Sequence, residues 1–203
     1  MSGTQYTVIG NAQSRAARVL WMLEELGQGY EHIGVKPHAA EVNSFNPSGK
    51  VPVLLVDGAP VTDSTAIVQY LADRHGQFTH AAGTLERARQ DALTQSILDE
   101  FDALLWVAAR HSFILPEPQR VPAVKDSLRW EFDRNQKLMV RRMGEGPFLM
   151  GEAMTVPDIV LTHCGIWARA AKFEISEPAL QAYLGRMLER PALRRALKAG
   201  SGR

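Results

Sequence analysis

A serine stands where a short apolar run gives way to an amphipathic stretch. It is Ser14, which ends the loop that begins at Gly10. A serine oxygen accepts backbone N–H groups at a helix N-cap, and the free N–H groups and dipole of a helix N-terminus attract anions. Two interpretations of Ser14 are therefore open: a simple cap, or a group beside a bound anion.

A second candidate is the segment Asn46-Pro-Ser-Gly-Lys-Val-Pro-Val-Leu. Pro52 heads an apolar strand pattern, and an X-Pro bond in the cis form fixes a tight turn. Such a turn would leave the backbone N–H and C=O of Val51 available to an extended ligand, with the cation of Lys50 beside it. The alternatives are an ordinary strand start and a solvated surface lysine.

The third candidate is Asp63-Ser64, directly before the pattern Thr-Ala-Ile-Val-Gln-Tyr-Leu. A ligand carboxylate could bind the N–H groups of this helix start and the Ser64 hydroxyl. The Asp63 carboxylate could hold an ammonium group. Helix capping by either residue is the alternative.

The elements that must position these groups differ between the two halves of the chain. In the first half, short apolar runs and helical spacings predict strands and helices in alternation, with a loop or short helix before the third strand. Gly27 and Gly76 stop the two long helices, and Asp57-Gly58 is a hairpin turn signal. The predicted strands are 6–9, 30–35, 51–56 and 60–62, and the predicted helices are 14–26 and 64–75.

The second half predicts helices alone. Residues 77–84 carry no charge and predict a linker, and five helical patterns follow it. Thr155 and Asp158 have the spacing of a capping box, and Met154 and Ile159 that of a hydrophobic staple. Cys164 falls within an apolar helical stretch and is expected in the core. The predicted helices are 85–111, 124–143, one from Thr155, 178–186 and 191–199.

Composition narrows the class of protein. The 203 residues are 45% hydrophobic and 22% charged, with a net charge of +1. These values predict a globular chain without the basic footprint of a nucleic-acid binder. No apolar run approaches the roughly 20 residues that span a bilayer, and the N-terminus lacks a secretory pattern. A single cysteine and no zinc-type histidine spacing predict no disulfide framework, no metal site and a cytoplasmic setting.

Taken in this order, the motifs resemble those of the glutathione S-transferase family, cytosolic type. Three stretches carry the resemblance: Ser14-Arg-x-x-Arg-Val-Leu-Trp-Met-Leu-Glu-Glu-Leu-Gly, the segment from Asn46 to Leu54, and Asp63-Ser64-x-Ala-Ile. The Thr155-Val-Pro-Asp158 cap matches the sixth helix of the family. The resemblance implies an α/β thioredoxin-like N-terminal domain, βαβαββα, at 1–76, a linker at 77–84 and an all-α domain at 85–203.

The resemblance also implies how the first domain binds glutathione. The Val51 backbone, before a cis Pro52, would pair with the cysteinyl part of the tripeptide. Asp63 and Ser64 would hold the γ-glutamyl end, although many relatives have Glu where this chain has Asp63. Lys50 would face the glycyl carboxylate, and His38 is a further candidate there.

The family activates the glutathione thiol with Tyr, Ser or Cys near the end of the first strand. The position of the Tyr-type enzymes falls on Gly10, and no cysteine precedes Cys164. Ser14 falls on the position of the catalytic serine in the Ser-type bacterial members. A helix N-terminus lowers a thiol pKa, and a serine O–H can donate to the thiolate. The alternatives are a neighbouring side chain or backbone N–H groups; the side chains are those of Asn11, Gln13 and Arg15.

The resemblance implies an enzyme that joins the glutathione thiolate to a hydrophobic electrophile, with peroxidase activity as a side reaction. Trp106, His111 and Trp167 are candidates for the electrophile site. Glutathione would be a co-substrate, with no metal or redox cofactor. A homodimer that works in cytoplasmic detoxification is expected. A non-enzymatic binding or regulatory protein and a glutathione-dependent isomerase remain as alternatives.

Overall fold

A computed structural model of the chain describes residues 3–199, which form two compact units. One unit contains the residues up to Thr79 together with those from Leu188 onward, and the other runs from His80 to Met187. The sequence predicts one domain over 85–203. In the structure the last helix, Pro191–Ala199, groups with the first unit instead. Residues 1–2 and 200–203, at the ends of the two expected domains, lie outside the described residues.

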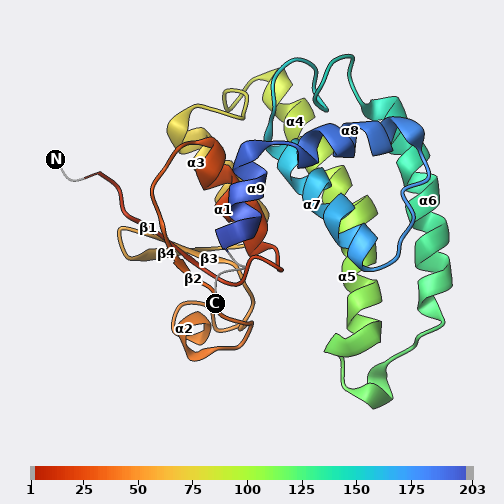
Figure 1. Cartoon of the computed structure of the whole chain (residues 1–203), viewed down its shortest axis with the longest axis horizontal. Helices are drawn as coiled ribbons and strands as arrows, with labels where there is room; N and C mark the ends of the chain where they lie inside the picture. Colours follow the sequence, from red (N-terminus) through yellow and green to blue (C-terminus); the bar gives the residue numbers. More distant parts are fainter. Residues whose placement is uncertain (1–2, 200–203) are drawn as a thin grey trace. The chain divides into compact units, whose positions relative to one another are not determined.

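The first unit is built on a four-stranded mixed sheet in the order β2-β1-β3-β4 (Figure 1). β1 is Tyr6–Ile9, β2 is Glu31–Ile33, β3 is Val53–Val56 and β4 is Ala59–Thr62. β1 runs parallel to β2 and antiparallel to β3, and β3 is antiparallel to β4. The turn between β3 and β4 has positive φ at Asp57 and Gly58, as the hairpin signal predicts.

Helices cover both faces of this sheet. α1 (Ala16–Glu25) packs against β1, α3 (Ser64–His75) and α9 (Pro191–Ala199), while α2 (Ala40–Asn43) lies on the other side (Figure 1). Ile9 and Val53 are paired across the sheet, and both pack against Val42 of α2. Successive strand residues face opposite sides, so Val8 and Leu54, also paired and fully buried, face the other layer. The element order βαβαββα predicted from the sequence is confirmed.

Two element boundaries differ from the sequence-based ones near the candidate site. The first helix begins at Ala16 rather than Ser14, because residues 12–15 form turns before the helix starts. The third strand begins at Val53 rather than Val51, since the Val51–Pro52 peptide bond is cis and turns the chain there. Both differences leave the candidate residues in loops at one end of the sheet, next to rigid elements.

The second unit is entirely helical in its described part. A long first helix is made of α4 (Leu85–Ile97), the π-helical turn η1 (Leu98–Asp102), α5 (Ala103–Ala109) and a second π-helical turn, η2 (Arg110–Ile114). The periodicity predicted one regular helix there. It is followed by η3 (Glu117–Gln119), α6 (Val124–Arg142), α7 (Val156–Ala170) and α8 (Pro178–Leu188), whose last residue belongs to the first unit.

Aromatic residues fill the core of the second unit. Phe132 of α6 meets Phe101 and Phe173 edge-on, with ring centroids 5.3 and 5.4 Å apart. Edge-to-face contact is a favourable geometry for aromatic rings. Cys164 of α7 is fully buried, as expected. Within the described residues no helix combines the length and the apolar character needed to cross a bilayer.

The capping box of α7 forms as the sequence predicts. The two Asp158 oxygens accept four hydrogen bonds, from the backbone of Leu149 and Thr155 and from the hydroxyls of Thr155 and Tyr183, at 2.8–3.2 Å. Burial first, and then the neighbouring Asp158 charge, hold the pKa of Tyr183 well above its ordinary value, so the phenol stays a donor. A fully buried carboxylate thereby ties the loop between α6 and α7, and also α8, to the start of α7.

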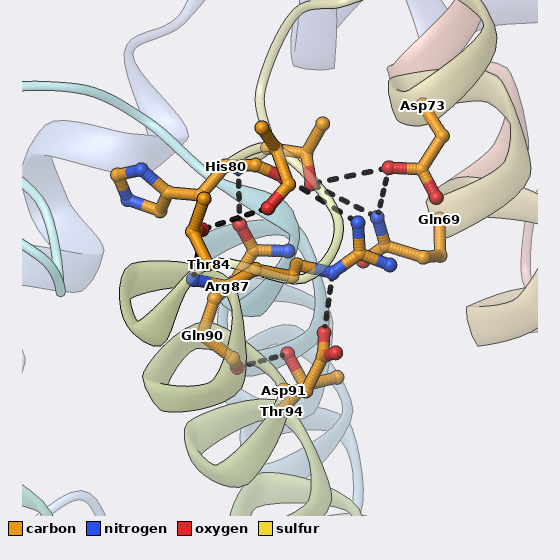
Figure 2. Close-up of polar contacts among 10 residues, drawn as sticks. Gln69, Asp73, His80, Thr84, Arg87, Gln90, Asp91 and Thr94 are labelled. Atoms are coloured by element: carbon orange, nitrogen blue, oxygen red, sulfur yellow. Dashed lines mark hydrogen bonds and ion pairs between the residues drawn. The ribbon is translucent and has the colours of Figure 1, made fainter.

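The predicted linker, residues 77–84, is divided between the two units after Thr79, and each part is hydrogen-bonded within its own unit (Figure 2). In the first unit, the Gln69 side chain donates to Asp73 at 3.0 Å and to the Thr79 hydroxyl at 2.9 Å. In the second, Gln90 accepts the N–H of His80 at 2.9 Å, and Thr84 caps α4 by accepting the N–H of Arg87 at 3.2 Å. The segment is therefore tied down by side chains from flanking helices.

Candidate functional site

The loop after β1 lies against the cis-proline turn at Gly10. Gly10 has φ +133°, and a Cβ added there would lie 2.9 Å from the Val51 Cβ and 3.1 Å from that of Ala16. Its carbonyl lies 2.8 Å from the His32 ring nitrogen Nε2. Only glycine fits this position, which brings the start of α1 next to Val51. The packing of Val51 and Ala16 around Gly10 leaves no room for a tyrosine side chain at this position.

Val51 presents a backbone edge that the sheet does not use. It lies before β3, with its side chain half-buried against the apolar cluster around Val42. Among residues 3–199, neither its N–H nor its C=O has a hydrogen-bond partner. A free donor and acceptor on one residue beside a strand end can bind an extended peptide. The following Pro52 is buried and lacks a backbone donor.

Ser14 lies in the turn before α1, partly exposed. It is not the N-cap residue: Arg15 is, and Arg15 makes no side-chain cap bond. The Ser14 hydroxyl donates to the Asn11 carbonyl at 2.7 Å and accepts the N–H of Ala16 at 3.1 Å. The oxygen thus still binds the first N–H of the helix, and its proton is held by a local carbonyl that a better acceptor can replace.

The Asn46 side chain shapes the loop that carries Lys50. Its carbonyl oxygen accepts the N–H and the hydroxyl of Ser48, at 3.1 and 2.8 Å, and its amide donates to the Lys50 carbonyl at 2.8 Å. Lys50 itself is exposed. The sequence alone gives Asn46 no role in binding, but the tendency of Asn to bind nearby backbone in turns is a signal for this loop-shaping function.

His38 is held beside the same loop. Its backbone N–H donates to the Gly49 carbonyl at 2.8 Å, and its ring occupies the space that a side chain at Gly49 would need. Both residues have positive φ, +65° for His38 and +67° for Gly49. The structure therefore brings His38 next to the segment of Lys50, as the sequence-based assignment requires, with the ring exposed to solvent.

Asp63 is the N-cap of α3. Its Oδ1 accepts the N–H groups of Thr65 and Ala66, at 2.9 and 3.2 Å, and its φ is +69°. Both cap bonds go to the same oxygen. The second oxygen, Oδ2, makes no hydrogen bond to residues 3–199, so the carboxylate can cap the helix and still accept from a ligand ammonium group.

Ser64 is the first residue of α3 and is only 3% exposed. Its hydroxyl accepts a hydrogen bond from Arg18 of α1, 3.2 Å from Nη1. Arg18 is 1% exposed, inside a run of eight buried residues, and the motif that begins at Ser14 contains it without assigning it a role. Its spacing to buried Trp21 and Met22, three and four residues on, was the signal that places it on a packed face.

The electrophile-site candidates all belong to the second unit. Trp106 lies on α5, His111 on η2 and Trp167 on α7, and all three are half-buried. The His111 ring nitrogen Nδ1 accepts the N–H of Val121 at 3.1 Å, which fixes the loop after η2. The Trp167 ring is 6.3 Å from that of His163. His111 thus has a structural role of its own.

Metal binding finds no support in the described part of the chain. Between residues 3 and 199, no three His, Cys, Asp or Glu side chains gather closely enough to hold an ion. The chemistry available to the loops around Gly10 comes from backbone groups, a hydroxyl, one carboxylate and exposed cations. Such a set offers partners for both the charged ends and the backbone of a small zwitterionic peptide.

Comparison with known proteins agrees with this fold and these loops. Residues 14–74 match the model of the glutathione S-transferase N-terminal domain. The chain is 25% identical to human glutathione S-transferase A4 over 201 residues, which cover 94% of this chain and 86% of that one. A sphingomonad glutathione S-transferase solved with glutathione has a TM-score of 0.81 and 25% identity, covering 96% of this chain and 98% of that one.

Part of a longer protein is also similar in sequence. The chain is 27% identical to probable elongation factor 1-gamma 2 of Arabidopsis thaliana over 173 residues, 81% of this chain but only 41% of that protein. The fold has a thioredoxin-like sheet first and a helical unit after it, which is the architecture of glutathione transferases. Residues 14–74 form a glutathione S-transferase N-terminal domain, and the chain as a whole is similar to members of that family.

Proposed function

We propose that this chain is a working transferase that binds glutathione at the loops around Gly10 and joins its thiolate to a hydrophobic electrophile. The open backbone edge of Val51 carries the proposal, because it offers one donor and one acceptor next to the loop that ends at Ser14. An extended cysteinyl residue paired there would bring its sulfur toward the start of α1. The co-crystallised glutathione of the sphingomonad relative supports the choice of peptide.

The charged ends of glutathione have matching partners at the loops on either side. The free Oδ2 of Asp63 accepts the γ-glutamyl ammonium, and Ser64 donates to the carboxylate beside it. At the other end, Lys50 and His38 meet the glycyl carboxylate from one exposed loop. In the helical unit, Trp106, His111 and Trp167 line the electrophile site in this proposal.

Ser14 activates the thiol in this proposal. A cysteine thiol has a pKa near 8.5 and is mostly protonated at neutral pH. The Ser14 hydroxyl turns from the Asn11 carbonyl, 2.7 Å away, to the thiolate, a stronger acceptor. It donates that hydrogen bond while its oxygen keeps the Ala16 N–H, so the thiolate is favoured with little rearrangement of the helix start.

A wider role follows from the same proposal. Glutathione is a co-substrate, no metal or redox cofactor is needed, and peroxidase activity is a side reaction of the same thiolate. The working form is a cytoplasmic homodimer that detoxifies electrophiles. A single buried cysteine fits a reducing compartment, and sedimentation of the purified chain tests the dimer.

The direct test is glutathione binding by calorimetry together with turnover of an aryl halide. Asp63→Asn is the informative variant, because Asn caps a helix as well as Asp but lacks the charge. We expect it to weaken glutathione binding by about 1.5–3 kcal/mol, the value of a hydrogen bond to a charged group. Asp57→Asn, at the opposite end of β3, is the matched control and should leave affinity unchanged.

Two outcomes would overturn the proposal. Unchanged affinity in Asp63→Asn removes this carboxylate from the site. Tight glutathione binding with no turnover across a broad electrophile panel instead favours the binding or regulatory role.

A further inference from the structure

We propose that Arg18 is a positioning residue for the γ-glutamyl carboxylate of glutathione: its buried guanidinium holds the Ser64 hydroxyl as a donor and places a positive charge beneath the first turn of α3. The inference rests on the proposed function. It assigns a role to a residue that does not itself touch the ligand. Three features of the first unit support it: burial, hydrogen-bond direction and charge.

Burial comes first. Arg18 is 1% exposed in the first turn of α1, where residues Ala16 to Leu23 are all buried. Arginine remains charged inside proteins, and a buried charge is costly unless it interacts with polar groups. An apolar side chain could pack at the same position of this buried run. The retained charge therefore indicates a demand beyond packing.

The direction of the hydrogen bond matters next. A guanidinium has only donors, so the bond of 3.2 Å between Arg18 Nη1 and Ser64 Oγ makes Ser64 the acceptor. The Ser64 proton is then left to donate elsewhere. Arg18 thus prevents the hydroxyl from donating toward the protein interior and keeps its proton available at the helix start.

The first turn of α3 offers few other donors to a carboxylate. The N–H groups of Thr65 and Ala66 are already used by Asp63. The Ser64 N–H has no acceptor among residues 3–199. The Ser64 N–H and O–H therefore form a two-donor pair for one carboxylate, at the positive end of a helix dipole. Arg18 behind Ser64 adds a full positive charge where the interior screens it weakly.

The test compares two peptides on the chain of 203 residues. Glutathione has the γ-glutamyl carboxylate, whereas 4-aminobutyryl-Cys-Gly lacks it and keeps the amine. In Arg18→Met we expect the Kd of glutathione to rise roughly tenfold, the loss of one charge-assisted contact, while the Kd of the analogue changes less than about twofold. Arg18→Lys should recover most of the glutathione affinity. The kcat at saturating glutathione should stay unchanged, because the thiol is activated elsewhere.

A merely structural Arg18 gives a different pattern. Arg18→Met would then lower the unfolding temperature and either leave both Kd values alone or weaken both peptides equally, and either result overturns the proposal. If Arg18→Met does not fold, Arg18→Gln replaces it: Gln can donate to Ser64 without the charge, so glutathione should bind more weakly to it than to Arg18→Lys. If Arg18→Gln and Arg18→Lys bind glutathione equally well, the charge of Arg18 has no role in binding.

Failure of the proposed function is distinguishable. An unaltered chain that binds no glutathione overturns both proposals. Glutathione binding that is normal in Arg18→Met but weakened in Asp63→Asn and Ser64→Ala overturns only the role of Arg18.

Discussion

Arg190 and Glu25, 165 residues apart in the chain, form a two-pronged ion pair. The Arg190 Nε and Nη2 lie 2.6 and 2.8 Å from the two Glu25 oxygens, and the Glu25 side chain is 8% exposed. The Trp21 indole N–H donates to the same carboxylate at 2.8 Å. This contact holds α9 on α1, the helix that follows the Ser14 turn.

Removing this carboxylate should destabilise the first unit. Glu25→Ala leaves the Trp21 N–H and the Arg190 guanidinium without their acceptor, so we expect a loss of about 2–4 kcal/mol in unfolding free energy. Glu25→Gln keeps one acceptor and should lose less. Chemical denaturation followed by tryptophan fluorescence measures both.

The matched control is the exposed pair of Arg194 and Glu189, whose side chains are 56% and 72% exposed. Glu189→Ala should change stability by less than about 1 kcal/mol, as for surface ion pairs. Equal losses in Glu25→Ala and Glu189→Ala would contradict the importance of the buried pair.

The Asp158 carboxylate should be the most sensitive polar position of the second unit. Asp158→Ala removes the acceptor of four hydrogen bonds in a fully buried place, so we expect a loss of about 3–5 kcal/mol in unfolding free energy. Tyr183→Phe removes one of these bonds and should cost about 1 kcal/mol. Urea denaturation followed by circular dichroism compares them, and similar losses in both variants would argue against a shared acceptor.

His75 should make the stability of the first unit depend on pH. Its Nε2 lies 3.0 Å from the Tyr6 hydroxyl, and burial, followed by the charge of Arg74, lowers the pKa of His75 below its ordinary value of 6.5. Burial likewise raises the pKa of Tyr6, so the hydrogen bond joins a neutral phenol to a neutral imidazole. As the pH falls, His75 therefore takes up a proton at a higher pH in the unfolded chain than in the folded chain.

The contribution of His75 is then fully present above about pH 6.5 and is lost as pH falls through the lowered pKa of the folded state. Denaturation at several pH values between 5 and 8 should show the unaltered chain losing more stability on acidification than His75→Gln. Tyr6→Phe keeps the ring buried but removes the hydrogen bond to His75. Its pH profile therefore shows how much of the pH-dependent stability comes from that hydrogen bond. Parallel pH profiles for the unaltered chain and His75→Gln would rule out this titration.

The ends of some elements could be read from the sequence because their signals are local. α3 begins after its Asp63 cap and ends before Gly76, whose backbone is left-handed, and both were predicted to the residue. The start of α7 followed from the Thr155 and Asp158 spacing. These signals act over a few residues, so sequence alone contains them.

Other features depend on contacts between distant segments and left no local pattern. α9 packs on α1 with a buried apolar face and with the pair of Arg190 and Glu25, and no periodicity connects these two distant segments. The two π-helical turns lie within a stretch whose sequence pattern predicts one continuous helix. In the candidate site, the residue types were predictable, whereas the bond from Arg18 to Ser64 required the packing of α1 on α3.

Ser14 provides the sharpest test of how the thiol is activated. If its hydroxyl donates to the thiolate, Ser14→Ala should raise the pKa of bound glutathione by about one unit or more, each unit being about 1.4 kcal/mol. Turnover of an aryl halide at neutral pH should fall roughly tenfold, while glutathione affinity changes less, since the charged ends of the peptide are held elsewhere. Thiolate absorbance against pH and calorimetry measure the two effects separately.

The bond from the Ala16 N–H to Ser14 complicates this experiment, because its loss can itself cost about 1 kcal/mol of stability. Ser14→Thr and Ser14→Asn separate the two effects: both can accept the Ala16 N–H, but only Thr keeps a hydroxyl. Activation by the hydroxyl requires Ser14→Thr to retain a low thiol pKa and Ser14→Asn to raise it. If Ser14→Ala leaves the thiol pKa and turnover intact, Ser14 only closes the turn before α1, and Asn11, Gln13, Arg15 or a backbone N–H group activates the thiol.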